Sequence, residues 1–198
     1  MSVGRFIVLE GLDGSGTTTQ ARALSEALRA RGHRVVETRE PTDGPVGRLL
    51  RAELRAAAPH PRAMALLFAA DRALHLAEVI EPALARGEVI VCDRYLMSSW
   101  VYQGLDCPAD WVRTINTPAR WPDHTFVLEV ASRTAMHRLE ARDMPREVFE
   151  TASIQARVEQ GYAACLREQL PGVVALDGGA SPADVTAKLV ALCVEAGL

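Results

Sequence analysis

A glycine-rich turn that follows an apolar segment constrains the fold more than any other feature of this chain. Residues 6–9 read Phe-Ile-Val-Leu, and glycines stand at positions 11, 14 and 16. Glycine lets the backbone curl until successive N–H groups face one anion, and a helix that begins there adds about half a positive charge. The segment therefore predicts a buried strand, a phosphate-binding loop and a helix, in that order.

One position of the loop departs from the Walker A pattern, which has Gly, four residues, Gly, Lys and then Ser or Thr. Gly11, Gly16 and Thr18 fit this pattern, but Thr17 stands where the lysine should be. Such a turn can also be a simple connection, but the apolar strand before it and the helical spacing after it favour nucleotide binding. The residues predicted to bind ATP are Gly11, Leu12, Asp13, Gly14, Ser15, Gly16, Thr17 and Thr18.

Composition limits the kind of protein and the kind of partner. With 198 residues, 48% of them hydrophobic, the chain is expected to form a single domain over 1–198. A formal net charge of −3 argues against nucleic acid as the main partner and leaves small molecules. The four cysteines lack metal-ligand spacing, and no apolar run approaches the roughly 20 residues of a membrane span. We therefore expect a cytoplasmic protein with no nucleic-acid or membrane partner.

Short apolar runs alternate with helical stretches along the chain. The predicted strands are rich in Val, Ile, Leu or Phe and cover residues 5–10, 35–39, 88–92, 125–130 and 173–177. The predicted helices cover residues 18–31, 46–57, 62–86, 109–116, 133–142, 147–169 and 182–196. This alternation predicts an α/β fold of three layers, in which a five-stranded parallel sheet is flanked by helices.

Ligands of such sheets sit at the carboxyl ends of the strands, so the residues after each strand are site candidates. Asp93 is placed like a Walker B acid, which holds Mg²⁺ directly or through water, although it could instead be the N-cap of the next helix. Arg39 and Arg94 suit forked hydrogen bonding to a phosphate. Lys188 is the one lysine, so arginine must supply any other fixed side-chain cation. The predicted metal ligands are Thr18 and Asp93.

Four motifs occur together and in one order. They are Leu9-Glu10-Gly11-Leu12-Asp13-Gly14-Ser15-Gly16, Thr38-Arg39-Glu40-Pro41, Leu67-Phe68-Ala69-Ala70-Asp71-Arg72 with His75, and Asp93-Arg94-Tyr95 followed by Ser98, Ser99 and Tyr102-Gln103-Gly104. In this combination, and at this length, the sequence strongly resembles bacterial thymidylate kinase, a P-loop nucleoside monophosphate kinase. The resemblance covers nearly the whole chain and implies the P-loop kinase fold with a short lid at about 138–149.

The resemblance also implies an activity. The family phosphorylates dTMP to dTDP with Mg²⁺ and ATP, in dTTP synthesis for DNA replication, and is usually a homodimer. Phe68 matches the aromatic residue that stacks on thymine, although from spacing alone it could equally be a core residue. Arg72 matches the arginine that reaches the base edge, and its spacing from Phe68 puts both on one helical face.

Further acceptor-site residues follow from the same resemblance. Ser99 and Gln103 match residues that select the pyrimidine, and Tyr102 matches a tyrosine that packs near the deoxyribose. Asp13 matches the acid that accepts the sugar 3′-OH. The arginines that match cations around the acceptor monophosphate are Arg39, Arg94 and Arg51.

The implied lid contains three arginines within nine residues. Relatives of one subtype close an arginine-bearing lid over the ATP phosphates, which makes Arg142 and Arg146 candidates for that task. A solvated, salt-bridged loop is the plainer interpretation. If a lid arginine replaces the cation that Thr17 lacks, the enzyme is active. The alternatives are a catalytically weak or inactive nucleotide-binding homologue and a different nucleoside monophosphate or deoxynucleoside kinase. The predicted catalytic residues are Asp13, Arg39, Arg94, Arg142 and Arg146.

Overall fold

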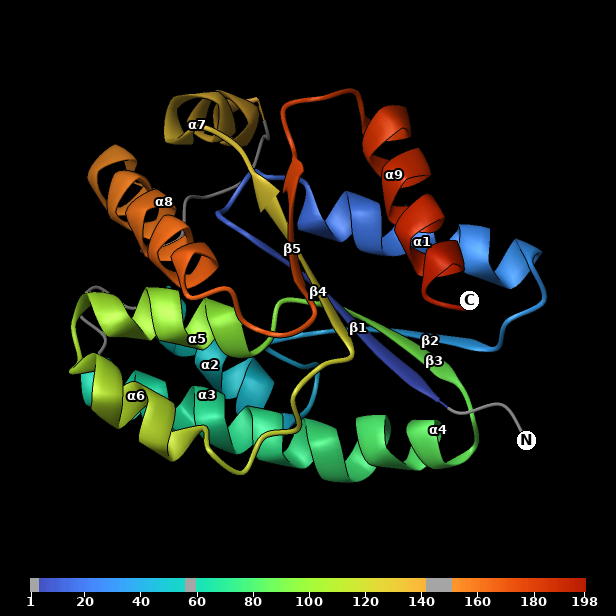
Figure 1. The fold of residues 1–198 in the computed structure, drawn as a ribbon. Coiled ribbons are helices and arrows are strands. Elements are labelled where there is room, and N and C mark those ends of the chain that lie inside the picture. The colour runs from blue at the N-terminus through green and yellow to red at the C-terminus, as the bar shows by residue number, and fades with distance from the viewer. Residues whose placement is uncertain (1–3, 56–59, 142–150) are drawn as a thin grey trace.

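Five parallel strands form one sheet in the computed structural model, in the order β2-β3-β1-β4-β5 (Figure 1). The structure describes residues 4–55, 60–141 and 151–198. The strands are β1 (Arg5–Gly11), β2 (Val35–Arg39), β3 (Val89–Asp93), β4 (His124–Glu129) and β5 (Val173–Asp177). The central strand β1 is buried after its first residue, as its apolar run requires. The predicted five-stranded parallel sheet is confirmed, and no strand end differs from its predicted position by more than one residue.

Helices connect the strands. They are α1 (Thr17–Ala30), α2 (Pro45–Leu54), α3 (Pro61–His75), α4 (Glu81–Ala85), α5 (Leu96–Tyr102), α6 (Ala109–Ile115), α7 (Ser132–Glu140), α8 (Ala152–Arg167) and α9 (Pro182–Glu195). A π-helical turn, η1 (Leu76–Ile80), joins α3 to α4, and a 3-10 turn, η2 (Gln103–Leu105), follows α5.

Two of these helical segments differ from the sequence prediction. The helix predicted over 62–86 is interrupted by η1, because Pro82 at the start of α4 has no N–H to donate to the preceding turn. No helix was assigned to residues 96–105, where α5 and η2 lie. The helices predicted over 46–57, 133–142 and 147–169 each include residues outside the described ranges. The candidates Arg142 and Arg146 also lie outside them.

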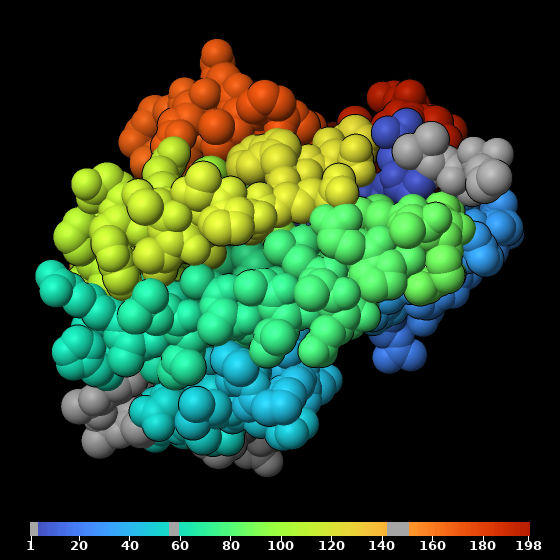
Figure 2. Space-filling model, turned by 90° about the horizontal axis from the view of Figure 1, so that it is seen from below, coloured from blue at the N-terminus to red at the C-terminus, as the bar shows by residue number. Residues whose placement is uncertain are grey.

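Helices cover both faces of the sheet. Because side chains along a strand point alternately to opposite faces, Ile7 and Leu9 of β1 pack with α1 and α9, whereas Phe6 and Val8 pack with η1, α4 and α5 (Figure 1). Helix α8 packs with α5 on this second side. Seen from below, α3, η1 and α4 form a continuous band beside α2 (Figure 2). The three-layer α/β fold is confirmed. Within the described part of the chain, none of the helices has the length and apolar character of a membrane span.

The parallel register brings three strand ends to one edge of the sheet. Asp93 at the end of β3 is level with Leu9 on one side and with Arg39 on the other. Beyond the strands, the N–H of Arg94 donates to the Leu9 carbonyl at 2.9 Å, and the N–H of Glu40 donates to the Asp93 carbonyl at 3.0 Å. The phosphate-binding loop therefore lies beside the segments that follow β2 and β3.

The close approach of α7 to the phosphate-binding loop gives a stability prediction. Gly14 and Gly16 have φ of 83° and 101°, so alanine is strained at either position. A Cβ on Gly14 would lie 2.5 Å from the Ala135 carbonyl oxygen of α7, whereas a Cβ on Gly16 would meet nothing within 4 Å. We expect Gly14→Ala to lower the free energy of unfolding by about 1–3 kcal/mol more than Gly16→Ala does in a urea titration. Equal losses would show that the contact with α7 is unimportant.

Candidate active site

Three cavities contain most of the predicted site residues. The inner cavity lies between α3, α5 and the phosphate-binding loop, and it is lined by Asp13, Glu40, Pro41, Leu54, Phe68, Arg72, Arg94, Tyr95, Ser98, Ser99, Tyr102 and Gln103. The outer cavity lies beside β2, and its lining includes Thr18, Thr38, Arg39, Thr42, Asp43, Asp71, His75 and Asp93. The loop cavity lies behind the phosphate-binding loop, and its lining includes Gly14, Ser15, Gly16, Gln20, Arg138, Gly178, Ala180 and Pro182.

The structure brings together seven of the nine residues that the resemblance assigned to dTMP. Asp13, Phe68, Arg72, Arg94, Ser99, Tyr102 and Gln103 all line the inner cavity. Phe68 also packs against the apolar cluster around Leu50 and Leu54 of α2. Phe68 therefore packs against the core and also lines the cavity. The Ser99 hydroxyl is buried without a hydrogen-bond partner, so it can still serve a ligand.

Arg39 and Arg51 lie apart from this group. Arg39 lines the outer cavity, and its Nη2 contacts both carboxylate oxygens of Asp43 at 2.9 and 3.1 Å. Arg51 also reaches Asp43, at 2.8 Å, and donates to the carbonyls of Pro41 and Thr42 at 2.8 and 2.6 Å. The Arg39 hydrogen bond lowers the pKa of the Asp43 carboxyl. Both arginines thus brace the segment after β2 rather than line the inner cavity beside Arg94.

Arg94 connects the phosphate-binding loop to the end of β3. Its backbone φ is 69°, in the left-handed region that costs about 1–3 kcal/mol for a residue other than glycine. The guanidinium donates to the Gly11 carbonyl at 2.9 Å and to Asp13 Oδ1 at 2.7 Å. It also lies 3.3 Å from the hydroxyl oxygens of Ser98 and Tyr102. These contacts hold a forked cation at the wall of the inner cavity.

Glu10 fixes the helix that follows Arg94. This buried carboxylate accepts the N–H groups of Tyr95 and Ser98 at 2.9 and 3.1 Å, and the hydroxyls of Ser98 and Tyr162 at 2.6 and 2.9 Å. Tyr95 precedes α5, so Glu10 serves helix-terminal N–H groups that lack partners within the helix. Burial raises the pKa of the Glu10 carboxyl, while Ser98 and the charge on Arg94 act in the opposite direction. The start of α5 is therefore tied to the end of β1.

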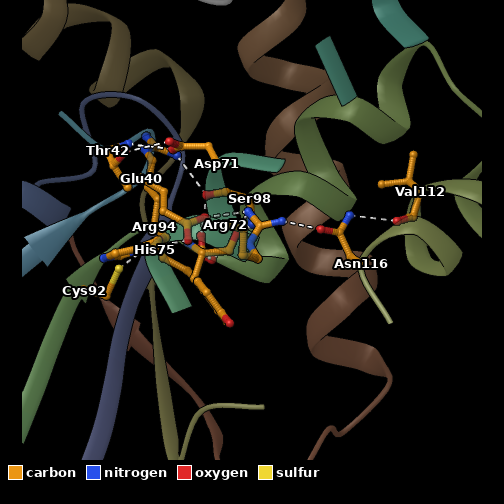
Figure 3. A network of polar contacts seen from close by, with 12 residues as sticks. Glu40, Thr42, Asp71, Arg72, His75, Cys92, Arg94, Ser98, Val112 and Asn116 are labelled. Carbon is orange, nitrogen blue, oxygen red and sulfur yellow. Dashed lines mark hydrogen bonds and ion pairs between the residues drawn. The ribbon is translucent and has the colours of Figure 1, made fainter. Parts of the chain in front are cut away.

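Arg72 is a buried cation within a network of polar contacts (Figure 3). Its guanidinium is 2.7 Å from Glu40 Oε2, donates to the Tyr95 carbonyl at 3.0 Å and donates to Asn116 Oδ1. Glu40 in turn contacts His75 Nδ1 at 3.0 Å. The Nε of Arg72 is buried and has no partner. Arg72 also lines the inner cavity, and buried polar groups in proteins usually have a hydrogen-bond partner.

Thr18 and Asp93 meet where a metal would be expected. The Thr18 hydroxyl donates to Asp93 Oδ2 at 2.5 Å, and the buried Oδ1 of Asp93 has no hydrogen-bond partner. An unpartnered carboxylate oxygen beside a hydroxyl suits Mg²⁺, which prefers oxygen ligands. The N-cap of α5 is Tyr95, so Asp93 does not cap that helix. Among the described residues, no three His, Cys, Asp or Glu side chains are grouped so that they could bind a metal.

The loop cavity is lined by an arginine that sequence reasoning did not select. Thr17 begins α1 and is buried. Arg138, in the last turn of α7, lies against the loop cavity and contacts carbonyls of the phosphate-binding loop. It belongs to the implied lid, but the lid candidates that the resemblance favoured, Arg142 and Arg146, lie outside the described residues.

Comparison with known proteins decides the family. A family model described as thymidylate kinase matches residues 9–189 of the chain. The chain belongs to the thymidylate kinase family. A protein of Pyrococcus horikoshii named "Probable thymidylate kinase" is 38% identical over 198 residues, which cover 96% of this chain and 95% of the relative. A protein of the same name from Methanococcus maripaludis is 42% identical over 161 residues, which cover 81% of this chain and 76% of the relative.

Several residues of this thymidylate kinase site were not predicted to have a role. Glu10 and Tyr95 fell within the quoted motifs but received no function, although a glutamate inside a buried apolar strand is itself a signal. Gln155 and Tyr162 of α8 reach Asp13 and Glu10, at 2.8 and 2.9 Å, and belong to no motif. No pattern in the sequence could have shown that α8 lies beside the phosphate-binding loop.

Proposed function

We propose that this chain transfers the γ-phosphoryl group of Mg·ATP to the 5′-phosphate of dTMP and so forms dTDP and ADP, in dTTP synthesis for DNA replication. One observation carries the proposal. Arg94 lines the cavity that contains Phe68, Arg72, Ser99 and Gln103, and it is bonded to the phosphate-binding loop at Gly11 and Asp13. A monophosphate held beside Arg94 would therefore face a nucleotide held by the loop.

The chemistry needs little beyond position and charge. The attacking oxygen of a monophosphate is already an anion, so no general base has to remove a proton. Arg94 can hold two phosphate oxygens with its fork, because its bonds to Gly11 and Asp13 fix the guanidinium. Phe68 offers a stacking face to the base, and the unpartnered Nε of Arg72 and Oγ of Ser99 offer polar contacts to its edge.

Magnesium belongs to the same proposal. Thr18 and Asp93 would hold Mg²⁺, which would neutralise negative charge on the donor phosphates. Support comes from the 2.5 Å contact between the two side chains and from the unpartnered Oδ1 of Asp93. The homodimer stays a prediction. Exposed apolar side chains that could serve such an interface are Leu49 of α2 and Leu66 and Leu74 of α3. The lid and the cytoplasmic location likewise stay predictions.

An inactive nucleotide-binding homologue, the alternative raised by Thr17, gains no support from the site. Such a protein would not need Arg94 to hold a strained backbone conformation at the wall of the inner cavity. It would also not need the contacts that fix the Arg94 guanidinium, which are with Gly11, Asp13, Ser98 and Tyr102. A different nucleoside monophosphate kinase remains the competitor within the enzyme class. The choice of acceptor separates it from a thymidylate kinase.

The first test of function is a coupled assay of ADP formation with a panel of monophosphates. We expect dTMP to be preferred over dUMP, and both over dCMP, UMP and purine monophosphates. Phe68→Ala should weaken dTMP binding by about 1–3 kcal/mol with little effect on ATP, because base–aromatic stacking is lost. Val194→Ala, an apolar truncation at an exposed position of α9, is the control and should change neither affinity. Equal rates with UMP or AMP would overturn the assignment.

The magnesium site is tested by the metal dependence of turnover. Asp93→Asn removes the carboxylate charge but keeps the shape, so we expect the Mg²⁺ concentration for half-maximal rate to rise about tenfold or more. Asp110→Asn, at an exposed position of α6, should leave it unchanged. If Asp93→Asn needs the same Mg²⁺ concentration for half-maximal rate as the parent protein, the metal binds elsewhere.

A further inference from the structure

Helix α3 holds the segment that follows β2 through three buried side chains (Figure 3). Asp71 accepts the Thr42 N–H at 2.7 Å and the Thr42 hydroxyl at 2.6 Å. Arg72 Nη2 lies 2.7 Å from Glu40 Oε2, and His75 Nδ1 lies 3.0 Å from Glu40 Oε1. Arg72 is proposed to contact the acceptor base, whereas His75 has no role in the proposed mechanism.

The two partners of the His75 ring fix where it carries a hydrogen. An ionised carboxylate can only accept a hydrogen bond, so Nδ1 carries the hydrogen that is donated to Glu40 Oε1. The other ring nitrogen, Nε2, lies 2.7 Å from the Thr38 hydroxyl, which can either donate or accept. Both nitrogens therefore have partners, and the ring is held between the end of β2 and the residue that follows it.

The Glu40 carboxylate depends on this ring for its direction. Within the described part of the chain, the bond from His75 is the only hydrogen bond that this carboxylate accepts, because Oε2 is at ion-pair distance from Arg72 but out of hydrogen-bond alignment. The Glu40 backbone is fixed independently, since its N–H donates to the Asp93 carbonyl at 3.0 Å. His75 therefore sets the orientation of the carboxylate and not the path of the chain.

Arg72 in turn depends on Glu40. Its guanidinium is buried, and its other printed partners, the Tyr95 carbonyl and Asn116 Oδ1, are neutral oxygens. Among the described residues, Glu40 is the only carboxylate at ion-pair distance from Arg72. A buried cation that loses alignment with its counter-ion loses much of the attraction that offsets its desolvation. A carboxylate that turns away would therefore release Arg72 from its place.

We propose that His75 is a positioning residue for acceptor recognition: its Nδ1–H orients the Glu40 carboxylate, and Glu40 holds Arg72 in place at the wall of the inner cavity. The inference rests on the proposed function, in which Arg72 contacts the base of dTMP. His75 lines the outer cavity, whereas Glu40 and Arg72 line the inner one. His75 therefore acts on the ligand through these two side chains and not by direct contact.

The test compares two amide replacements, each of which keeps one contact of the His75 ring. The amide nitrogen in His75→Asn is bonded to Cγ, as Nδ1 is, so it still donates to Glu40. The amide nitrogen in His75→Gln lies one bond farther out, as Nε2 does, so it reaches Thr38 instead. Glutamine also fills more of the space that the ring leaves. A purely structural role therefore favours His75→Gln, whereas the positioning role favours His75→Asn.

Each variant is assayed for the Kd of dTMP, for kcat and for the KM values of dTMP and ATP. We expect His75→Gln to raise the Kd and KM of dTMP about tenfold, with kcat and the KM of ATP within about threefold of the parent, because one hydrogen bond to a charged group is lost. His75→Asn should keep the Kd of dTMP within about threefold. Leu189→Ala, a core truncation in α9, is the control for lost stability and should leave the Kd of dTMP unchanged.

A double-mutant cycle shows whether His75 acts through Arg72. Arg72→Lys keeps the charge but not the fork, so it should weaken dTMP binding about tenfold by itself. Adding His75→Gln to Arg72→Lys should then change the Kd less than about twofold, because the guanidinium that His75 positions is already gone. By NMR, the Arg72 Nε–H signal is assigned by its loss in Arg72→Lys. Its exchange with water should be about tenfold faster in His75→Gln and unchanged in Leu189→Ala.

Equal dTMP affinities in His75→Asn and His75→Gln, tighter binding in His75→Gln, or additive effects in the cycle would overturn the inference. If His75→Gln does not fold, His75→Phe takes its place, because phenylalanine keeps a ring but has no hydrogen-bond donor. A parent that binds dTMP without forming dTDP would overturn the proposed function, and the affinities would still decide the inference. If the parent binds no dTMP, the exchange rate of the Arg72 Nε–H decides it, since that rate is measured without a ligand.

Discussion

The contact between Arg94 and Asp13 joins the two strand ends from which the site is built. Arg94 follows β3, Asp13 lies in the loop after β1, and their side chains meet at 2.7 Å. The left-handed backbone of Arg94 is tolerated because the guanidinium also holds the Gly11 carbonyl and contacts the Tyr102 ring. A parallel sheet places these strand ends side by side, and this ion pair ties the phosphate-binding loop to the wall of the inner cavity.

Buried charges around this pair position helices more than they stabilise the fold. Glu10 accepts four hydrogen bonds beneath α5, and Arg72 joins α3 to Glu40 and Asn116. Burying such groups costs about as much as their pairing returns, while removing one partner leaves an uncompensated charge. Their effect is to fix α3 and α5 on either side of the inner cavity. Arg138 differs, because no acid among the described residues compensates it.

Features that depend on local sequence patterns could be predicted, whereas features that depend on contacts between distant residues could not. The sheet was predictable because strands buried on both faces are continuous apolar runs. Most of the candidate site residues could be selected because they follow the ends of these strands. Helix α5 was not assigned because it is short and is capped by Glu10, which is 85 residues away from Tyr95. Arg39 and Arg51 lie outside the inner cavity, where both pair with Asp43, and their role at the acceptor phosphate stays a prediction. Arg138 was passed over because its carbonyl partners carry no sequence signal.

We propose that the fork of Arg94, held by the phosphate-binding loop, places the acceptor phosphate. Its most direct test is the turnover of dTMP by Arg94→Ala and Arg94→Lys, with dTMP and Mg·ATP saturating. The account predicts a loss of about two orders of magnitude or more in Arg94→Ala. Arg94→Lys should recover only part of it, because an ammonium cannot reproduce the bonds to Gly11 and Asp13 together with a phosphate. Full activity in Arg94→Lys, or an undiminished rate in Arg94→Ala, would contradict the account.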